Sequence, residues 1–290
     1  ATLCLCSLSV LFSGICWGQV GPEANKGDGK DASAVDTVAG TVVYLEFDQQ
    51  ASEIVDINGA KRECDVYYRV PGQDRFSPKR ITVSGTGFIV KSGVTLDIVT
   101  AKHVVGNSKS IGRYWINPTK GEIVSGAFAG IQKTIPGSKW FFHDSADIAI
   151  HPLLLTQCTA EFRVIESDTF PTAPPELLTL VCIPGFPHAL GKDNIRLGPL
   201  VVTSEVASWP ALLPGNGLPV KVIFLNHRLA QGYSGSPVYT LRDPPSRPLS
   251  KHHMMLIGVV SGCYMFPVPT GSQNPLTQDE LSYIVPVSYV

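Results

Sequence analysis

Apolar residues recur along this chain in short runs of strand length, rich in Val and Ile, with Gly, Pro and polar residues between them. They fall into two sets, before and after a polar, Pro-rich segment at 166–176. The first set is 41–47, 64–70, 81–90, 95–101 and 146–153, and the second is 177–186, 197–208, 220–226, 236–241, 254–262 and 282–289. No helical period is sustained, which disfavours a parallel sheet that alternates with helices. The pattern predicts an all-β protein with two subdomains.

The first residues follow a different pattern. Residues 3–17 form an uncharged apolar run with the length of a secretory h-region, and a small Gly18 precedes a polar stretch. The run is shorter than the about 20 apolar residues that a transmembrane helix needs. We therefore expect a signal peptide at 1–18, a flexible linker at 19–36 and a folded domain at 37–290. The protein would be exported, either secreted or periplasmic, and would touch a membrane only through an uncleaved N-terminal segment.

Composition narrows the function further. A chain of 290 residues, 44% apolar and 16% charged, can bury a large core, and a formal net charge of -1 leaves no basic field for nucleic acid. Four cysteines follow the expected signal peptide, and they can pair in three ways or remain thiols: Cys64, Cys158, Cys182 and Cys263. None of their spacings is that of a zinc site, so we expect no metal and no cofactor. The sequence leaves the oligomeric state open.

One short run near the end of the chain carries possible chemistry. The run 231–239, "QGYSGSPVY", places two Gly and two Ser directly before an apolar strand. Such clusters are usually turns. Ser234 is a candidate nucleophile only if an imidazole can take its proton and a carboxylate can hold that imidazole in the correct tautomer.

Candidates for the base and the acid both lie at strand ends in the first half. His103 follows the strand "DIVTA" in "TAKHVV", where a rigid element can direct its side chain. Asp147 opens "DIAI", where a carboxylate at the entrance to the core must be paired. The remaining histidines have contexts typical of surface or core residues: His143, His151, His188, His227, His252 and His253.

The order His103, Asp147, Ser234, within "TAKHVV", "ADIAI" and "GYSGSP", resembles the chymotrypsin-like serine peptidases. The similarity is to the bacterial trypsin-like branch that includes the high-temperature-requirement peptidases, and it covers roughly residues 37–290. Three further segments resemble that family: "GTGFIV" at 85–90, "GFP" at 185–187 and "VVTSEVAS" at 201–208.

This resemblance implies two six-stranded antiparallel β-barrels, at about 37–160 and about 176–290, with the active site in the cleft between them. The chain would be a serine endopeptidase that cleaves a peptide or unfolded protein through an acyl-enzyme. The backbone N–H groups of Gly232 and Ser234 would form the oxyanion hole.

The resemblance also implies where a substrate binds. Val260, Ser261 and Gly262 would be the strand edge along which a peptide lies, with Ser261 close to Asp147. Arg228 lies six residues before Ser234, a position that often forms the floor of the specificity pocket. A buried Arg228 would favour acidic side chains, whereas a solvated Arg228 leaves a preference for small or apolar ones.

Two other functions stay open. A binding module on a catalytically silent trypsin-like fold would keep the scaffold without the reaction. An α/β-hydrolase esterase is disfavoured, because Ser236 stands where its nucleophile elbow needs Gly and because its triad order differs.

Overall fold

The structure is a computed structural model that describes residues 39–57, 60–71, 73–93, 95–106, 111–118, 122–129, 131, 138–153, 162–167, 170–190, 197–213, 219–241, 254–265 and 280–290. The predicted signal peptide and linker and Cys158 lie outside these residues. Strands predominate in the described part, which confirms the all-β fold class. None of the helices described there has the length and apolarity to cross a bilayer.

The first half forms an 8-stranded sheet with the order β10-β11-β7-β6-β1-β8-β9, and β12 adds to β6. The pairings are antiparallel except that of β12 with β6. The strands are β1 (Val42–Gln50), β6 (Arg80–Ser92), β7 (Thr95–Thr100), β8 (Ile111–Ile116), β9 (Val124–Ala127), β10 (Phe141–Phe142), β11 (Ala149–Pro152) and β12 (Ile165–Glu166).

The second half forms a 7-stranded antiparallel sheet with the order β14-β13-β17-β18-β19-β16-β15. An antiparallel bridge between Val206, directly after β14, and Leu225 of β16 links the first and sixth strands in this order. The strands are β13 (Leu180–Gly185), β14 (Leu200–Glu205), β15 (Ala211–Leu213), β16 (Val220–Leu225), β17 (Pro237–Thr240), β18 (Leu256–Met265) and β19 (Glu280–Pro286). Short 3-10 turns follow β13 at η2 (Pro187–Ala189) and β19 at η3 (Val287–Tyr289).

The alternation of side chains along β6 and β7 explains how the two sheets share a core. Ile89 and Ile98 point into the core of the first sheet, while their neighbours Phe88 and Val99 point to its other face. On that face they pack in one cluster with apolar residues of the second sheet, including Val222 and Val259. Strands buried on both faces therefore join the two halves.

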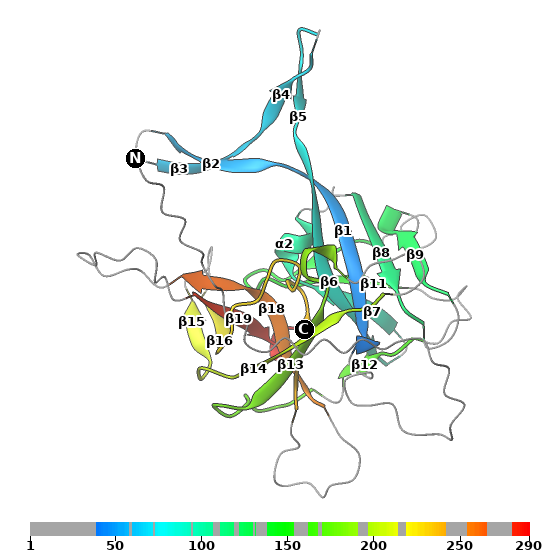
Figure 1. Ribbon diagram of the computed structural model, residues 1–290, viewed down its shortest axis with the longest axis vertical. Helices are drawn as coiled ribbons and strands as arrows, with labels where there is room; N and C mark the ends of the chain where they lie inside the picture. The colour runs from blue at the N-terminus through cyan, green and yellow to red at the C-terminus, as the bar shows by residue number, and fades with distance from the viewer. Residues whose placement is uncertain are drawn as a thin grey trace, which may run out of the picture. The chain divides into compact units, whose positions relative to one another are not determined.

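Two hairpins are inserted between β1 and β6 (Figure 1). They are β2 (Ser52–Ile57) with β3 (Ala60–Asp65), and β4 (Tyr67–Arg69) with β5 (Phe76–Pro78). Three backbone hydrogen bonds join the points where they begin and end: Ala51 N–H to Lys79 C=O at 2.7 Å, Val66 N–H to Ala51 C=O at 2.8 Å, and Lys79 N–H to Val66 C=O at 2.8 Å. The strand predicted at 64–70 is therefore interrupted at Val66, where the chain passes from one hairpin to the other.

Candidate active site

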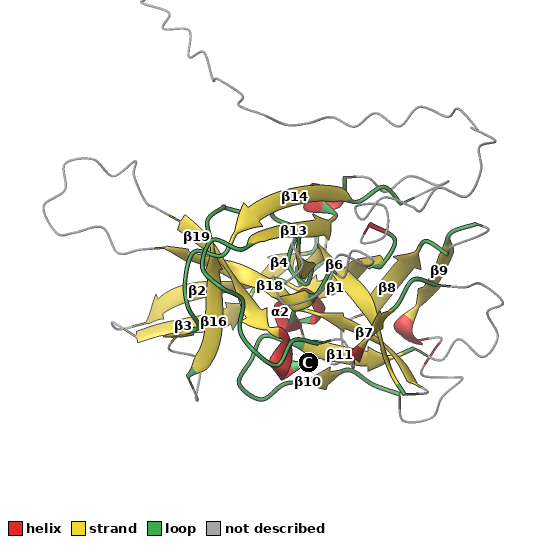
Figure 2. Cartoon of the chain, turned by 90° about the horizontal axis from the view of Figure 1, so that it is seen from below, coloured by secondary structure: helices red, strands yellow, loops and turns green. Residues whose placement is uncertain are grey.

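His103 is held by a one-turn helix that follows β7 directly. In α2 (Lys102–Val105), Val104 and Val105 are fully buried, whereas the His103 side chain is 48% exposed. The Gln49 side-chain amide donates hydrogen bonds to the carbonyl oxygens of His103 and Val104 at 3.3 and 2.7 Å, so it satisfies groups that end the helix. Burial of the two valines leaves the imidazole at the surface. Figure 2 shows the helix α2, in red, near the middle of the view.

Asp147 lies in a tight turn before β11, and a second histidine shapes this turn. The Nδ1 atom of His143 accepts hydrogen bonds from the backbone N–H groups of Ser145 and Ala146 at 3.2 and 3.0 Å. The His143 N–H donates to the Ile148 carbonyl at 3.0 Å. The sequence context of His143 was typical of an ordinary surface or core residue, and only the folded turn shows that its ring positions Asp147.

The carboxylate of Asp147 accepts three hydrogen bonds. The His103 Nδ1–H donates to Oδ2 at 2.7 Å, the His103 backbone N–H donates to Oδ1 at 3.0 Å, and the Ser261 hydroxyl donates to Oδ2 at 2.6 Å. Burial of the carboxyl opposes its ionisation, but the hydrogen bonds and charge of His103 outweigh burial, with help from Ser261, and hold the pKa of Asp147 below its ordinary value. When the His103 imidazole is neutral, an ionised Asp147 keeps its proton on Nδ1 and leaves Nε2 as an acceptor.

Four successive carbonyl groups in the turn at Ser234 are held by hydrogen bonds. The Gln231 carbonyl accepts from His188 N–H at 2.9 Å, and the Gly232 carbonyl accepts from the Thr86 hydroxyl at 2.8 Å. The Tyr233 carbonyl accepts from the N–H of Ser236 at 2.8 Å, and the Ser234 carbonyl accepts from the N–H of Thr86 at 2.9 Å. The orientation of each peptide plane in the turn is therefore determined.

The orientation of these peptides leaves two donors unused. A trans peptide points its C=O and N–H groups in opposite directions, so fixing the carbonyls of Gln231 and Tyr233 turns the N–H groups of Gly232 and Ser234 the other way. Within the described residues, neither N–H donates a hydrogen bond to the chain. Backbone N–H groups without a partner are rare in folded proteins, and this pair can donate hydrogen bonds to an anionic oxygen.

Glycine is required at two points of this turn. Gly232 has φ 99° and Gly235 has φ 83°, values that a side chain disfavours. A methyl group on Gly232 would collide with the Phe186 carbonyl oxygen, and one on Gly235 would collide with the Thr86 carbonyl oxygen. The backbone of the turn packs so closely on the segments at Thr86 and Phe186 that neither position has room for a side chain.

The turn at Ser234 lies against the segment that carries His103. A methyl group on Gly85 would lie 2.7 Å from Val104 Cγ1 and 3.2 Å from the Ser234 carbonyl oxygen. In the described part of the chain, the Ser234 hydroxyl makes no hydrogen bond to the His103 imidazole. Such bonds are often long without substrate and shorten when it binds. The structure thus brings the three candidates to one place and joins His103 to Asp147 directly.

The predicted substrate edge, in β18, is joined to both parts of the site. Val260 N–H donates to the Ser236 carbonyl at 2.9 Å, and the Val260 carbonyl accepts from Gly235 N–H at 2.8 Å. The pairing of β18 with β19 is irregular between Val260 and Gly262, which lets Ser261 between them point to Asp147.

Arg228 is exposed, although the next residue, Leu229, is buried and donates its N–H to the Ser282 hydroxyl at 2.8 Å. The preference that Arg228 would give the pocket stays a prediction.

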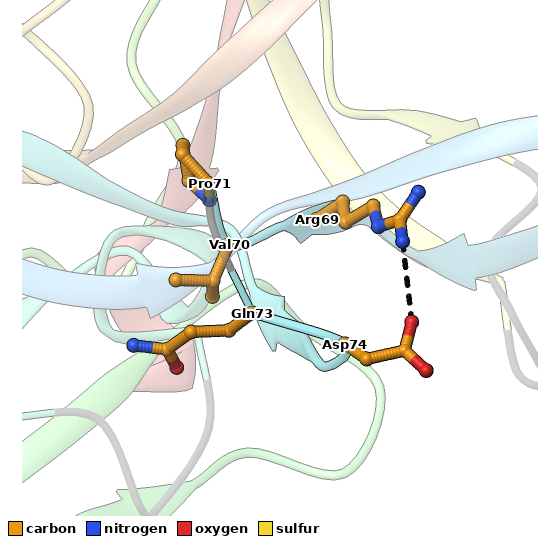
Figure 3. Close-up of a pocket in the computed structure, with 5 residues that line it drawn as sticks. All are labelled: Arg69, Val70, Pro71, Gln73 and Asp74. Carbon is orange, nitrogen blue, oxygen red and sulfur yellow. Dashed lines mark hydrogen bonds and ion pairs between the residues drawn. The ribbon is translucent and has the colours of Figure 1, made fainter.

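Other groups with possible chemistry take no part in the contacts described above. The described cysteines Cys64, Cys182 and Cys263 are free thiols, and burial raises the pKa of Cys182 to about 12. The described residues contain no cluster of His, Cys, Asp and Glu that could hold a metal ion. A hollow at the end of the β4–β5 hairpin is lined by Arg69, Val70, Pro71, Gln73 and Asp74 (Figure 3), and it is far too open to enclose a small molecule.

Solved structures with similar folds are proteases. The protease domain of MamO from Magnetospirillum magneticum is 15% identical, with a TM-score of 0.48, and the match covers 87% of this chain and 94% of that one. Deg5 is 13% identical, with a TM-score of 0.48, and the match covers 88% and 87%. The HtrA-type protease AlgW, solved with a decapeptide, is 14% identical, with a TM-score of 0.50, and the match covers 88% of this chain and 62% of that one.

No protein-family model matches the sequence, and no curated protein is significantly similar to it. The likeness to the solved structures therefore concerns the fold. Together with the two antiparallel sheets, it confirms the predicted chymotrypsin-like, all-β architecture.

Proposed function

We propose that this chain is a serine endopeptidase in which Ser234 is the nucleophile, His103 the general base and Asp147 the residue that orients the imidazole. The observation that carries the proposal is the 2.7 Å hydrogen bond from His103 Nδ1–H to an ionised Asp147. This bond leaves the Nε2 lone pair free to take the proton of an attacking hydroxyl.

The reaction follows from these positions. The Ser234 hydroxyl loses its proton to His103 Nε2 as its oxygen attacks the scissile carbonyl carbon. The negative charge that develops on the carbonyl oxygen is stabilised by the free N–H groups of Gly232 and Ser234. His103 then returns the proton to the leaving amine, and an acyl-enzyme remains on Ser234. Water hydrolyses this ester by the same steps, with His103 again as the base.

The substrate class is a peptide or an unfolded protein. The Val260 backbone groups are bonded to Gly235 and Ser236, so an extended peptide can add as a strand only beside the following residues of β18, Ser261 and Gly262, in reach of the Ser234 turn. The decapeptide in the structure of AlgW, a protein of similar fold, supports a peptide as the ligand.

Labelling of Ser234 tests the proposal. A fluorescent serine-directed phosphonate is expected to modify the wild type with a stoichiometry near one, and to modify neither Ser234→Ala nor His103→Ala. Each single variant and the double variant should lose peptide hydrolysis by similar factors, because triad members act as a unit. The buried serine variant Ser204→Ala, outside the site, is the matched control and should label like the wild type.

The competing function, a silent fold that only binds peptides, predicts the opposite result. In that case the wild type would remain unlabelled while a peptide still bound to it. Multiplicative losses in the double variant would also contradict the triad.

A further inference from the structure

The β4–β5 hairpin projects from the first sheet (Figure 1), and together with Lys79 and Arg80, the first residue of β6, it makes up an arm at residues 67–80. Its large apolar side chains are exposed: Tyr67 by 54%, Tyr68 by 51% and Phe76 by 69%. Tyr67 pairs with Pro78 and Arg69 pairs with Phe76, so these four side chains share one face of the hairpin. That face is both apolar and cationic.

The charge of the arm differs from that of the whole chain. Residues 67–80 contain four bases (Arg69, Arg75, Lys79 and Arg80) and one acid (Asp74), an excess of three positive charges, while the chain as a whole carries -1. Asp74 lies 3.2 Å from Arg69, with side chains 99% and 69% exposed, so water screens this pair strongly. Arg69 and Arg75 lie on the hairpin beside the exposed aromatic rings, and Lys79 and Arg80 lie at its base.

Packing gives no reason for these aromatic residues to be on the arm. β4 and β5 pair only with each other among the described strands, and a two-stranded hairpin alone is marginally stable. Tyr67, Tyr68 and Phe76 belong to none of the buried clusters. Aromatic rings beside Arg and Lys are the combination found where proteins meet the headgroup region of a bilayer.

We propose that the arm docks the protein on an anionic lipid surface, with Tyr67 and Phe76 at the depth of the headgroups and the basic side chains against lipid phosphates. Two observations favour lipid over nucleic acid. None of the three rings lines the hollow described at the end of the hairpin, and beyond the arm the chain has no basic excess. At the end of the arm, Val70 and Pro71 point away from the Arg69–Asp74 pair (Figure 3), and these apolar side chains can enter the bilayer first.

This docking is independent of the proposed peptidase chemistry, because the arm contributes no residue to that site. It also extends the expectation from the sequence, which allowed membrane contact only through an uncleaved N-terminal segment.

Sedimentation with lipid vesicles tests the proposal on the protein from residue 37 onward, the whole folded domain expected from the sequence, and in parallel on the full chain. The protein is expected to bind vesicles of phosphatidylcholine with phosphatidylglycerol and not vesicles of phosphatidylcholine alone. Binding should fall at least tenfold between 0.05 M and 0.5 M salt, because screening shortens the reach of the charges. The double variants Tyr67→Ser/Phe76→Ser and Arg75→Ala/Lys79→Ala should each weaken binding at least tenfold.

The matched control removes a similar pair elsewhere. Lys139 lies 5.8 Å from the ring centre of Phe141, which is 53% exposed, so Lys139→Ala/Phe141→Ser takes one cation and one exposed ring from another surface. It should bind vesicles like the wild type. All variants should keep the wild-type melting temperature and peptide hydrolysis.

Three results would overturn docking to lipid. Equal binding to neutral vesicles would remove the role of charge. Vesicle binding unchanged in both arm variants would place the contact elsewhere. Arm-dependent binding of single-stranded DNA, or arm-dependent dimers in ultracentrifugation, without vesicle binding would assign the arm to another partner.

Discussion

Position 232 shows how one residue type determines the chemistry of the site. Its φ of 99° disfavours any side chain, and the Phe186 carbonyl fills the place of a methyl group. The peptide that joins Gln231 to Gly232 carries the Gly232 N–H, one of the two N–H groups without a partner in the described residues. An alanine here must therefore move the peptide, and the donor moves with it.

The Gly232→Ala variant is accordingly expected to lose about 10² to 10³ in kcat/KM for peptide hydrolysis, the usual cost of one oxyanion donor. The control is Gly93→Ala, which has a φ of 59° but open space around the new methyl group. It carries similar backbone strain far from the site and should hydrolyse peptide like the wild type. Equal activity of the two variants would argue against an oxyanion role for Gly232.

Residue types that react are easier to predict from sequence than residues that position them. His103, Asp147 and Ser234 could be named because their motifs combine reactive side chains with strand ends and turns. Thr86 and His143 could not, because their roles lie in contacts with backbone groups. Thr86 is bonded to a turn more than 140 residues away, and no local pattern reports such a partner.

At the scale of elements, β6 connects the two halves of the site through Thr86. Its hydroxyl donates to the Gly232 carbonyl at 2.8 Å and accepts from Phe186 N–H at 3.1 Å, and the residue is fully buried. Replacing the hydroxyl by a methyl group would leave both backbone groups without these bonds.

We expect Thr86→Val to lower the free energy of unfolding by about 2 kcal/mol, within the range for buried groups left unpaired. It should also lower kcat/KM at least tenfold, because the peptide that joins Gly232 to Tyr233, between the two donor N–H groups, is no longer held. Thr86→Ser keeps both hydrogen bonds and loses only a methyl group, so it should stay within about threefold of the wild type. Urea unfolding and peptide hydrolysis measure the two effects. A Val variant as active as the Ser variant would show that the hydroxyl does not position the turn.

Some of the strands that the sequence pattern missed carry Gly or charge. β8 has Gly112 in its interior, which suggests a turn in sequence, yet a side chain there would collide with Phe47. The long runs that became β6, β13 and β18 were predicted because they alternate or are continuously apolar. Strands such as β8, which the local sequence does not favour, form because they pair with strands that are distant in the sequence.

For the whole molecule, a buried imidazole links stability to pH. His151 is fully buried and packs against the rings of Phe128 and Trp140, with centroid distances of 4.9 and 5.1 Å, and its Nδ1–H donates to the Pro152 carbonyl at 2.7 Å. Burial lowers its pKa below the ordinary value, an effect that the Pro152 bond partly offsets. The folded state thus favours the neutral ring.

The free energy of unfolding should therefore fall as the pH drops below about 6.5, where the unfolded chain takes up a proton that the folded chain refuses. Urea unfolding at pH 8 and pH 5.5 measures this slope. His151→Phe and His151→Gln should both flatten it, while the exposed His188→Gln should keep it. Burial raises the pKa of Asp97, which acts in the opposite sense, but Asp97 is present in every variant. An unchanged slope in both His151 variants would exclude this histidine as the source.

The three hydrogen bonds among Ala51, Val66 and Lys79 hold together the points where the two inserted hairpins begin and end, so either hairpin could be lengthened or removed without moving the rest of the fold. Each inserted hairpin leaves and re-enters the body between residues that already touch, so excising one would create ends that a short turn could rejoin. The other hairpin would keep its own entry and exit. Lengthening either one costs little closure entropy, since that cost grows only with the logarithm of loop length. The arm, with its proposed lipid contact, could thus be lost, exchanged or lengthened while the residues of the proposed peptidase site stay unchanged.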